Sequence, residues 1–202
     1  MTLSAFRDLA DRMMQPLVTG AVRVGLTPNL VSVVAILVAG AAGGAFALAG
    51  DRPVLYLLGA VLVVLNGILD LLDGGLAREL GVESLSGDMF DHVLDRYADI
   101  LIVGGLATGI ENYLLGFVAV TGVLMTSYLG TQAEAVGIER VYGGLLGRAD
   151  RLALVTAVTL LAPFVEMTVF DVGLVGLLLI VFAVVGHLTA AQRFYYSMQE
   201  LS

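Results

Sequence analysis

Four aspartates stand in two closely spaced pairs, Asp70 with Asp73 and Asp91 with Asp95. Residues three or four apart lie on the same face of a helix, so each pair would present its carboxylates from one helical face. The segment between the pairs, residues 79–86, contains a glycine and two serines and can turn, which would set two antiparallel helices with their carboxylates facing each other. Oxygen-only ligands favour Mg²⁺, Mn²⁺ or Ca²⁺ over Zn²⁺. Four carboxylates suffice for two metal ions that share ligands, the arrangement that clamps the attacking and leaving oxygens in phosphoryl transfer.

Small and basic residues accompany the first pair. Gly74 and Ala77 share its helical face and leave room for a bulky group to approach the backbone. Arg78 supplies a fork of N–H donors that suits a phosphate. The alternative is that the aspartates are solvated loop charges, or that they pair with Arg78 and Arg96. That alternative would explain a single aspartate near a helix end, but the repeated helical spacing favours a shared metal site.

The composition indicates that these carboxylates belong to a membrane protein. Of the 202 residues, 58% are hydrophobic and 14% are charged, whereas a soluble domain has about 45–50% apolar and about 25% charged residues. This excess predicts an all-α, polytopic membrane protein and argues against soluble and disordered classes. The net charge of −8 argues against a nucleic-acid partner, which would require a basic face. The absence of cysteine excludes disulfides and thiolate sites.

Six apolar stretches predict transmembrane helices, each of which needs about 20 residues. The pairs Gly40-xxx-Gly44 and Gly105-xxx-Gly109 would permit close helix crossing. We expect one transmembrane domain, residues 21–202, that contains six spans. The expected spans are residues 29–50, 54–69 (continuing into the aspartate segment), about 90–110, 113–129, 152–165 and 172–191.

The first 20 residues have a different pattern. Apolar residues recur at helical spacing from Leu3 to Leu17, while Arg7, Asp8 and Arg12 fall on other faces. We expect residues 1–20 to form an amphipathic helix that lies in the membrane interface. A frayed soluble leader is the alternative.

The arginines predict the orientation. With six spans, both termini lie on one side of the membrane, and all basic residues except Arg52 fall on that side. An excess of basic residues marks the cytoplasmic side. We therefore expect a multi-pass protein of the plasma membrane with the aspartates facing the cytoplasm.

From Asp70 to Asp95 the chain has the pattern D-x2-D-G-x2-A-R-x8-G-x3-D-x3-D. This pattern resembles the signature of the CDP-alcohol phosphotransferases, membrane enzymes of phospholipid head-group synthesis, and it matches at every defined position. The six-span plan, the N-terminal helix and the stretch Thr27-Pro28-Asn29 before the first span are also similar to that family. The resemblance implies an enzyme that transfers a phosphatidyl or archaetidyl group from a CDP-linked lipid to an alcohol and releases CMP.

The resemblance also implies roles for individual residues. The four motif aspartates would hold two Mg²⁺ ions, with Mn²⁺ as a substitute, and Asp95 would also be the base that deprotonates the acceptor hydroxyl. The donor would be CDP-diacylglycerol or CDP-archaeol, and a homodimer is expected. The residues expected to bind the CDP-lipid are Pro28, Asn29, Ser32, Gly74, Ala77, Arg78 and Ser84.

The acceptor region is less defined. Residues 127–135 and 147–152 are similar to the acceptor region of phosphatidylinositol-phosphate synthases and their archaeal ether-lipid counterparts, which usually carry a Lys and an Arg at the positions of Gly130 and Gln132. Arg148 and Arg193 remain in matching places, and two arginines can hold an acceptor phosphate. We expect a polar, phosphorylated alcohol such as glycerol phosphate or inositol phosphate, with an uncharged alcohol as the alternative.

Two other functions compete with this one. A cation or proton transporter would also carry intramembrane carboxylates, but near the bilayer midplane and often in repeated halves. Here the aspartates lie at one end of two predicted helices, and no repeat is evident. An inactive scaffold subunit would have lost a motif aspartate, and none is lost. The sequence therefore favours a Mg²⁺-dependent phosphotransferase.

Overall fold

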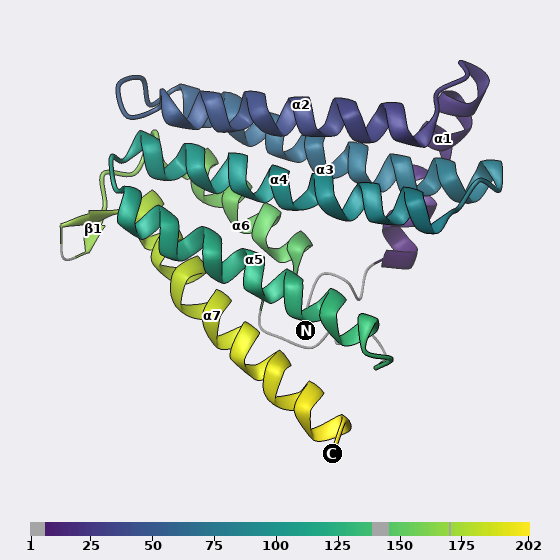
Figure 1. The fold of residues 1–202 in the computed structure, drawn as a ribbon. Coiled ribbons are helices and arrows are strands. Elements are labelled where there is room, and N and C mark those ends of the chain that lie inside the picture. The colour runs from purple at the N-terminus through teal and green to yellow at the C-terminus, as the bar shows by residue number, and fades with distance from the viewer. Residues whose placement is uncertain (1–6, 139–145, 170) are drawn as a thin grey trace.

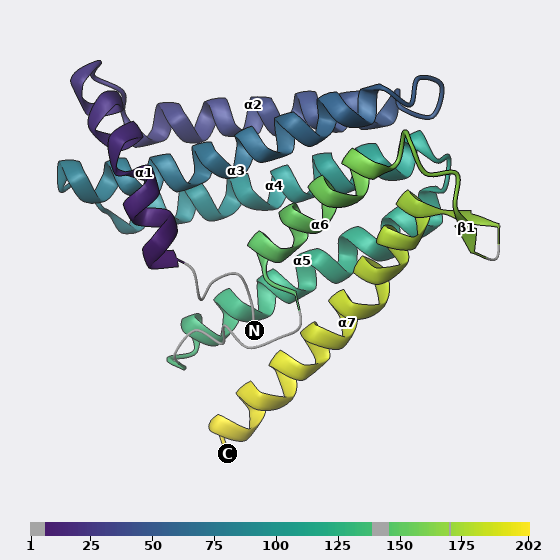
Figure 2. The ribbon, with the colours of Figure 1, turned by 180° about the vertical axis from the view of Figure 1, so that it is seen from behind.

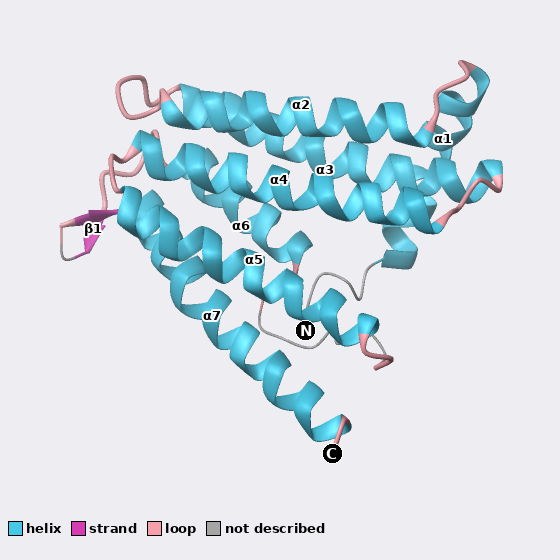
Figure 3. Cartoon of the chain, viewed as in Figure 1, coloured by secondary structure: helices cyan, strands magenta, loops and turns pink. Residues whose placement is uncertain are grey.

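The computed structural model describes residues 7–138, 146–169 and 171–202. The start of the expected interfacial segment, residues 1–6, and Arg140 of the orientation argument lie outside the described residues. The described chain is helical apart from one short hairpin (Figures 1 and 3). In chain order its elements are α1 (Arg7–Arg23), α2 (Pro28–Ala47), α3 (Leu55–Leu80), α4 (Leu85–Gly109), α5 (Tyr113–Ala135), α6 (Arg148–Leu161), β1 (Thr168–Val169), β2 (Val172–Gly173) and α7 (Leu174–Glu200).

The helices form two groups that diverge toward one end of the molecule. Helices α2, α3 and α4 run side by side, while α5 and α7 pair with each other and slant away from them (Figure 1). Helix α6 lies between α3 and α7, as the view from behind shows (Figure 2). The β1–β2 hairpin, in which Val169 pairs with Val172, lies at the end where the two groups converge (Figure 1). The two groups lie farthest apart at the opposite, open end, where residues of both line one cavity (Figure 1).

Local signals set the helix ends near the aspartates. Thr27 is the extended residue before α2, and Pro28 occupies its first turn, where a missing N–H costs nothing. Helix α3 ends at Gly81, which has the left-handed φ of 63° that glycine adopts readily. Ser84 then caps α4, because its Oγ accepts a hydrogen bond from the Gly87 N–H at 3.1 Å. Gly81 and Ser84 together place the end of α3 and the start of α4 side by side.

Glycine allows α2 and α4 to touch through their backbones. A Cβ added to Gly105 would lie 2.2 Å from the Gly43 carbonyl oxygen, and one added to Gly43 would lie 2.3 Å from the Leu101 carbonyl oxygen. Phe46 and Leu106 are fully buried in the main core beside this contact. The seam between the two helices is therefore too close for any side chain at positions 43 and 105.

Four of the described helices, α2, α3, α5 and α7, are long and apolar enough to cross a membrane. Helix α6 has 14 residues, which at about 1.5 Å per residue is shorter than the roughly 30 Å hydrocarbon core. Helix α4 is long enough, but its first half carries the charged residues of the aspartate segment. All six expected spans are helices, and length with composition supports four of them as spans.

Candidate functional site

Carboxylates from α3 and α4 meet at the open end of the molecule. Asp70 lies in the second half of α3, while Asp91 and Asp95 lie one turn apart in the first half of α4. Each of the three offers a ligand atom, and these atoms all lie within 4.8 Å of one another. The antiparallel arrangement expected from the spacing is therefore present, and it gathers three of the four motif aspartates into a cluster that fits a metal ion.

Asp73 is held differently from the other three. It is buried, and its Oδ2 accepts a hydrogen bond from the Ser32 hydroxyl at 2.7 Å. Its Oδ1 accepts one from the Gly74 N–H at 2.6 Å. An ionised carboxylate has about four lone-pair sites, so both oxygens keep a free acceptor position. Asp73 is thus fixed in place by α2 and by its own helix.

Arg148, the first residue of α6, reaches into the cluster. Its Nη1 lies 2.5 Å from Asp70 Oδ1 and its Nη2 lies 2.7 Å from Asp95 Oδ1. Arg148 therefore joins α3 and α4 through two short ion pairs and offsets part of their mutual repulsion. The sequence analysis assigns Arg148 to the acceptor, whereas its ion pairs in the structure are with two of the expected metal ligands.

A second ionic group lies one turn further along α4. Asp99 is buried and pairs with the buried Arg151 of α6, with Nη2 2.8 Å from Oδ2. Arg96 lies 3.9 Å from the same Asp99 oxygen and 3.5 Å from Asp95. Arg96, Asp99 and Arg151 therefore connect the cluster to the core between α4 and α6.

One cavity of about 1640 Å³ contains the whole site. It opens where the two groups of helices diverge, and residues of α2 to α7 line it. Every site residue that the sequence singled out is on its wall, namely Pro28, Asn29, Ser32, Asp70, Asp73, Gly74, Ala77, Arg78, Ser84, Asp91, Asp95, Arg148 and Arg193. The structure brings these residues together, and their individual roles remain predictions.

The expected nucleotide residues line the wall formed by the starts of α2 and α4 and the end of α3. A Cβ added to Gly74 would lie 3.5 Å from Nη1 of Arg78, so this guanidinium extends over the glycine. Pro28 and Asn29 line the same cavity from the start of α2. The Ser84 hydroxyl is engaged as the helix cap and lies 3.2 Å from the Ser86 hydroxyl. This wall combines an arginine with small residues, which suits a phosphate-bearing ligand.

Arg193 of α7 occupies the wall opposite. Its Nη1 donates to the Thr126 carbonyl oxygen of α5 at 2.7 Å. A Cβ added to Gly130 would lie 3.0 Å from the same Nη1. Gly130 therefore leaves the space in which the Arg193 side chain crosses α5, at a position where similar enzymes usually carry a lysine.

The carboxylate oxygens of the cluster are suitable ligands for a divalent cation. A small pocket of about 10 Å³ lies within the cluster, and a cavity of roughly this size holds one water-sized particle. Oxygen atoms of carboxylates are the ligands that Mg²⁺ and Mn²⁺ prefer. The wall of this pocket includes all four motif aspartates together with Ser32, Asn66 and Arg148. The residues present therefore suit the expected metal.

Sequence reasoning considered Arg96 only as an alternative partner of the motif aspartates, and it missed one polar residue of the site. Asn66 was passed over within an apolar stretch, although it precedes Asp70 by one helical turn. That spacing was the available signal, because it places Asn66 on the same face of α3.

Comparisons with known proteins agree on one family. The family model described as CDP-alcohol phosphatidyltransferase matches residues 25–193. An archaetidylinositol phosphate synthase of Methanothermobacter thermautotrophicus is 32% identical over 200 residues, covering 98% of this chain and 95% of that protein. A phosphatidylinositol phosphate synthase of Mycobacterium marinum is 35% identical over 159 residues, covering 72% and 63%.

Solved structures of similar fold were also found. The Mycobacterium tuberculosis phosphatidylinositol phosphate synthase with CDP-DAG bound has a TM-score of 0.78 and 26% identity, covering 92% of this chain and 94% of that one. The same enzyme in complex with manganese and citrate has a TM-score of 0.77 over 91% of this chain and 88% of that one.

Proposed function

The chain belongs to the CDP-alcohol phosphatidyltransferase family, and we propose that it transfers the phosphatidyl or archaetidyl group of a CDP-linked lipid to a polar alcohol and releases CMP. The observation that carries this function is the meeting of Asp70, Asp91 and Asp95 within 4.8 Å on the wall of the large cavity. A cation or proton transporter is not favoured, because Arg148 ion-pairs with Asp70 and Asp95 and similar proteins are named as synthases.

The proposed reaction exchanges one phosphorus–oxygen bond for another. The acceptor oxygen attacks the lipid-side phosphorus of the CDP-lipid, the bond from that phosphorus to the bridging diphosphate oxygen breaks, and CMP leaves with the electron pair. Asp95 takes the proton of the attacking hydroxyl. Its carboxylate is buried and held 2.7 Å from the Arg148 guanidinium, so its position is fixed before the acceptor arrives. Proton removal by a positioned base contributes about 10²–10⁴-fold to such reactions.

We propose that Asp70, Asp73, Asp91 and Asp95 hold two Mg²⁺ ions, which Mn²⁺ can replace. The manganese complex of the M. tuberculosis relative supports a divalent metal in this fold. When bound, the metal neutralises charge on the diphosphate and stabilises the departing CMP. The Ser32 hydroxyl and the Gly74 N–H keep the Asp73 carboxylate in one orientation. On the cavity wall beside it, Gly74, Ala77 and Arg78 bind the nucleotide diphosphate, aided by Pro28, Asn29 and Ser84.

We propose a phosphorylated acceptor, either inositol phosphate or glycerol phosphate. Arg148 and Arg193 both line the cavity, from α6 and α7. Arg193 extends across α5 because Gly130 has no side chain. Guanidinium groups recognise phosphate through paired hydrogen bonds, so two of them can replace the Lys and Arg that similar enzymes carry at positions 130 and 132. Several relatives are named for inositol phosphate products, which favours that acceptor.

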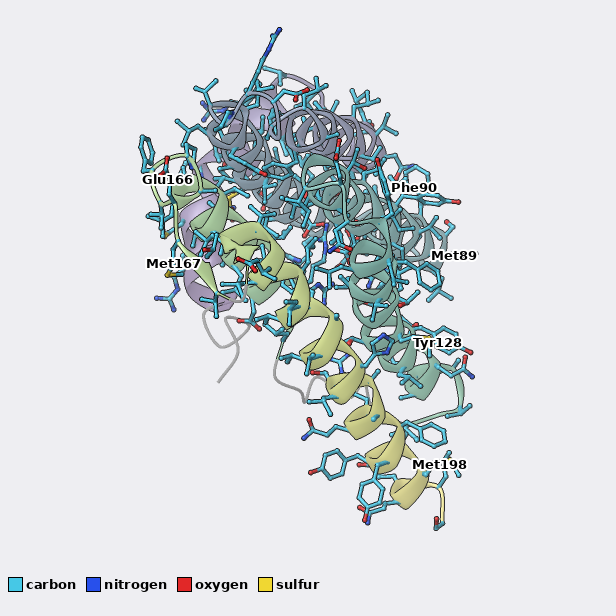
Figure 4. All side chains as sticks on the ribbon, turned by 90° about the vertical axis from the view of Figure 1, so that its left-hand side faces the viewer. Met89, Phe90, Tyr128, Glu166, Met167 and Met198 are labelled. Carbon is cyan, nitrogen blue, oxygen red and sulfur yellow. The ribbon has the colours of Figure 1, made fainter. Side chains whose placement is uncertain are left out.

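We further propose six spans, with the site facing the cytoplasm of the cell membrane. Exposed apolar side chains project from the outer faces of α4 and α5, among them Met89, Phe90 and Tyr128 (Figure 4). On α1, Met13 and Leu17 are exposed while Met14 and Val18 are buried, which supports an interfacial position for this helix. The cysteine-free chain allows single cysteines to be introduced, and impermeant thiol labelling on each side of the membrane tests the orientation. Light scattering of the purified protein tests the proposed homodimer.

The test of the function is release of CMP. Purified protein is incubated with CDP-diacylglycerol or CDP-archaeol, Mg²⁺ and a panel of acceptors: inositol phosphate, glycerol phosphate, inositol and glycerol. We expect CMP release with one phosphorylated acceptor and none with the free polyols. Absence of CMP with every acceptor, from protein shown to be folded, would refute the function.

Asp95→Asn tests the proposed base. We expect turnover to fall at least about 100-fold while binding of the CDP-lipid persists, because the amide cannot take the acceptor proton. Asp51→Asn is the matched control, since this exposed aspartate lies in the turn between α2 and α3, at the far end of the molecule. Near-native turnover by Asp95→Asn would exclude Asp95 as the base.

A further inference from the structure

Asn66 is a buried polar residue that the proposed chemistry does not use. It lies on α3, one turn before Asp70, and only 1% of it is exposed. Its Nδ2 donates to the Ala35 carbonyl oxygen of α2 at 2.9 Å. Its Oδ1 is buried and has no hydrogen-bond partner among the residues that the structure describes. An unsatisfied buried acceptor destabilises the folded protein, so its presence in an otherwise apolar stretch of α3 calls for a reason.

The Ala35 carbonyl fixes the direction of the Asn66 amide. A side-chain amide has one oxygen acceptor and one NH₂ donor group. Rotation of the amide by half a turn would set its oxygen against the Ala35 oxygen, two acceptors in contact. The Nδ2 group therefore stays on Ala35, and Oδ1 is turned away from it.

Asn66 lines the small pocket that lies within the aspartate cluster. Both Nη atoms of Arg148 pair with Asp70 and Asp95, and the Ser32 hydroxyl donates to Asp73. Nε of Arg148 is buried too, but it makes no hydrogen bond to Asn66 within the described residues. The carboxylates themselves are acceptors when ionised. A molecule that enters the pocket is therefore the donor that fits Asn66 Oδ1.

We propose that Asn66 is a positioning residue of the metal site, whose Oδ1 accepts a hydrogen bond from a water molecule bound to the divalent cation. Mg²⁺ usually keeps several waters in protein sites, and each such water is a donor that needs an acceptor. This inference rests on the proposed metal site. Residues that hydrogen-bond to metal ligands typically change metal affinity by about 10–100-fold when they are replaced.

The competing explanation is that Asn66 only ties α2 to α3 through Ala35. The two explanations differ in what they predict for Asp and Leu at this position. Asn66→Asp keeps an oxygen at the pocket but loses the donor to Ala35, whereas Asn66→Leu loses both. If only the hydrogen bond to Ala35 matters, Asn66→Asp and Asn66→Leu weaken metal binding equally. If Oδ1 serves the metal, only Asn66→Leu loses metal affinity.

The experiment measures Mn²⁺ binding to the purified full chain, from the electron paramagnetic resonance signal of free Mn²⁺. We expect the Kd to rise about 10–100-fold in Asn66→Leu and to stay native or fall in Asn66→Asp. Thermal unfolding in EDTA, measured on the same samples, confirms that each variant is folded, and Asn66→Ala is a second apolar variant if Asn66→Leu does not fold. Thr126→Val is the matched control, because it removes a buried hydrogen bond of 2.8 Å from α5 to the Gly186 carbonyl of α7, and its Kd should be unchanged.

Two results would overturn the inference. One is a native Mn²⁺ affinity in folded Asn66→Leu or Asn66→Ala, and the other is equal weakening in Asn66→Asp and Asn66→Leu. Failure of the native chain to bind Mn²⁺ would refute both the proposed metal site and the proposed role of Asn66. The CMP-release assay on the native chain tests the function separately, so loss of either proposal is distinguishable from loss of the other.

Discussion

Gly105→Ala should destabilise the protein, while the neighbouring Gly104→Ala should not. A Cβ at position 105 would lie 2.2 Å from the Gly43 carbonyl oxygen and 2.6 Å from the Gly43 Cα. A Cβ at position 104 meets nothing within 4 Å. The two substitutions add the same methyl group to adjacent positions of α4, and only one of them is directed at the backbone of α2.

The size of the effect follows from the packing at this seam. Non-bonded carbon atoms in contact lie about 3.5–4.0 Å apart, so α2 and α4 would have to separate by roughly 1 Å, which forfeits a quarter to a half of each contact energy across the gap. Phe46, Ile102 and Leu106 are buried beside this contact and would lose part of their packing. Overpacking typically costs about 1–3 kcal/mol. Both substitutions gain about 0.5–1 kcal/mol from helix propensity, so this gain cancels and the pair should differ by roughly 1–3 kcal/mol.

Thermal unfolding of the detergent-purified variants measures this difference. For a chain of this length, 1 kcal/mol shifts Tm by about 2–4 °C, so the two variants should differ by roughly 2–12 °C. Circular dichroism is the suitable signal, because the chain has no cysteine for thiol-reactive dyes. A Tm of Gly105→Ala equal to or above that of Gly104→Ala would refute the close backbone contact between α2 and α4.

Three further substitutions test the ionic and polar groups of the site. Asp99→Asn leaves the Arg151 cation buried without its carboxylate and should cost about 3–5 kcal/mol in thermal unfolding; an unchanged Tm would contradict the buried pair. Ser32→Ala removes a hydrogen bond to the Asp73 carboxylate, worth about 1.5–3 kcal/mol, and should weaken Mn²⁺ binding about tenfold or more; native affinity in folded protein would contradict that role. Arg148→Ala should raise the KM of the acceptor more than that of the CDP-lipid, and equal changes in steady-state kinetics would remove Arg148 from the acceptor pocket.

Hydropathy and residue spacing predicted the helices better than they predicted the contacts between helices. The stretch expected from about residue 90 begins as α4 at Leu85, because the charged first turns hide the helix from an apolar pattern. The pair Gly105-xxx-Gly109 does lie at a close crossing, with Gly109 against the Phe46 carbonyl. The other expected pair lies at no close crossing within the described chain, because a Cβ added to Gly44 would meet nothing within 4 Å and one added to Gly40 would lie 3.9 Å from Leu101 Cδ1, while Gly43 makes the contact with α4. Which glycine faces a neighbour depends on how α2 is rotated, and the sequence of α2 alone does not specify that rotation.

The same limit applies to the site. Residues that share one helical face could be predicted from their spacing, but contacts between different helices could not. The motif placed four aspartates on two facing helices, and the cavity confirms that they share one wall. No pattern in the sequence pairs Arg148, the first residue of α6, with the aspartates, although its ion pairs with Asp70 and Asp95 reduce the negative charge of the cluster.

With every group ionised, the four motif aspartates and Asp99 stand against Arg96, Arg148 and Arg151, five carboxylates against three guanidinium groups. The excess is two negative charges, the charge that one divalent cation neutralises. Counting carboxylates in the sequence suggested enough negative charge for two metal ions, but the arginines reduce that excess. A second divalent cation would leave the site positively charged until a diphosphate arrives, so the charge balance of the site links occupancy by two metals to the presence of the CDP-lipid.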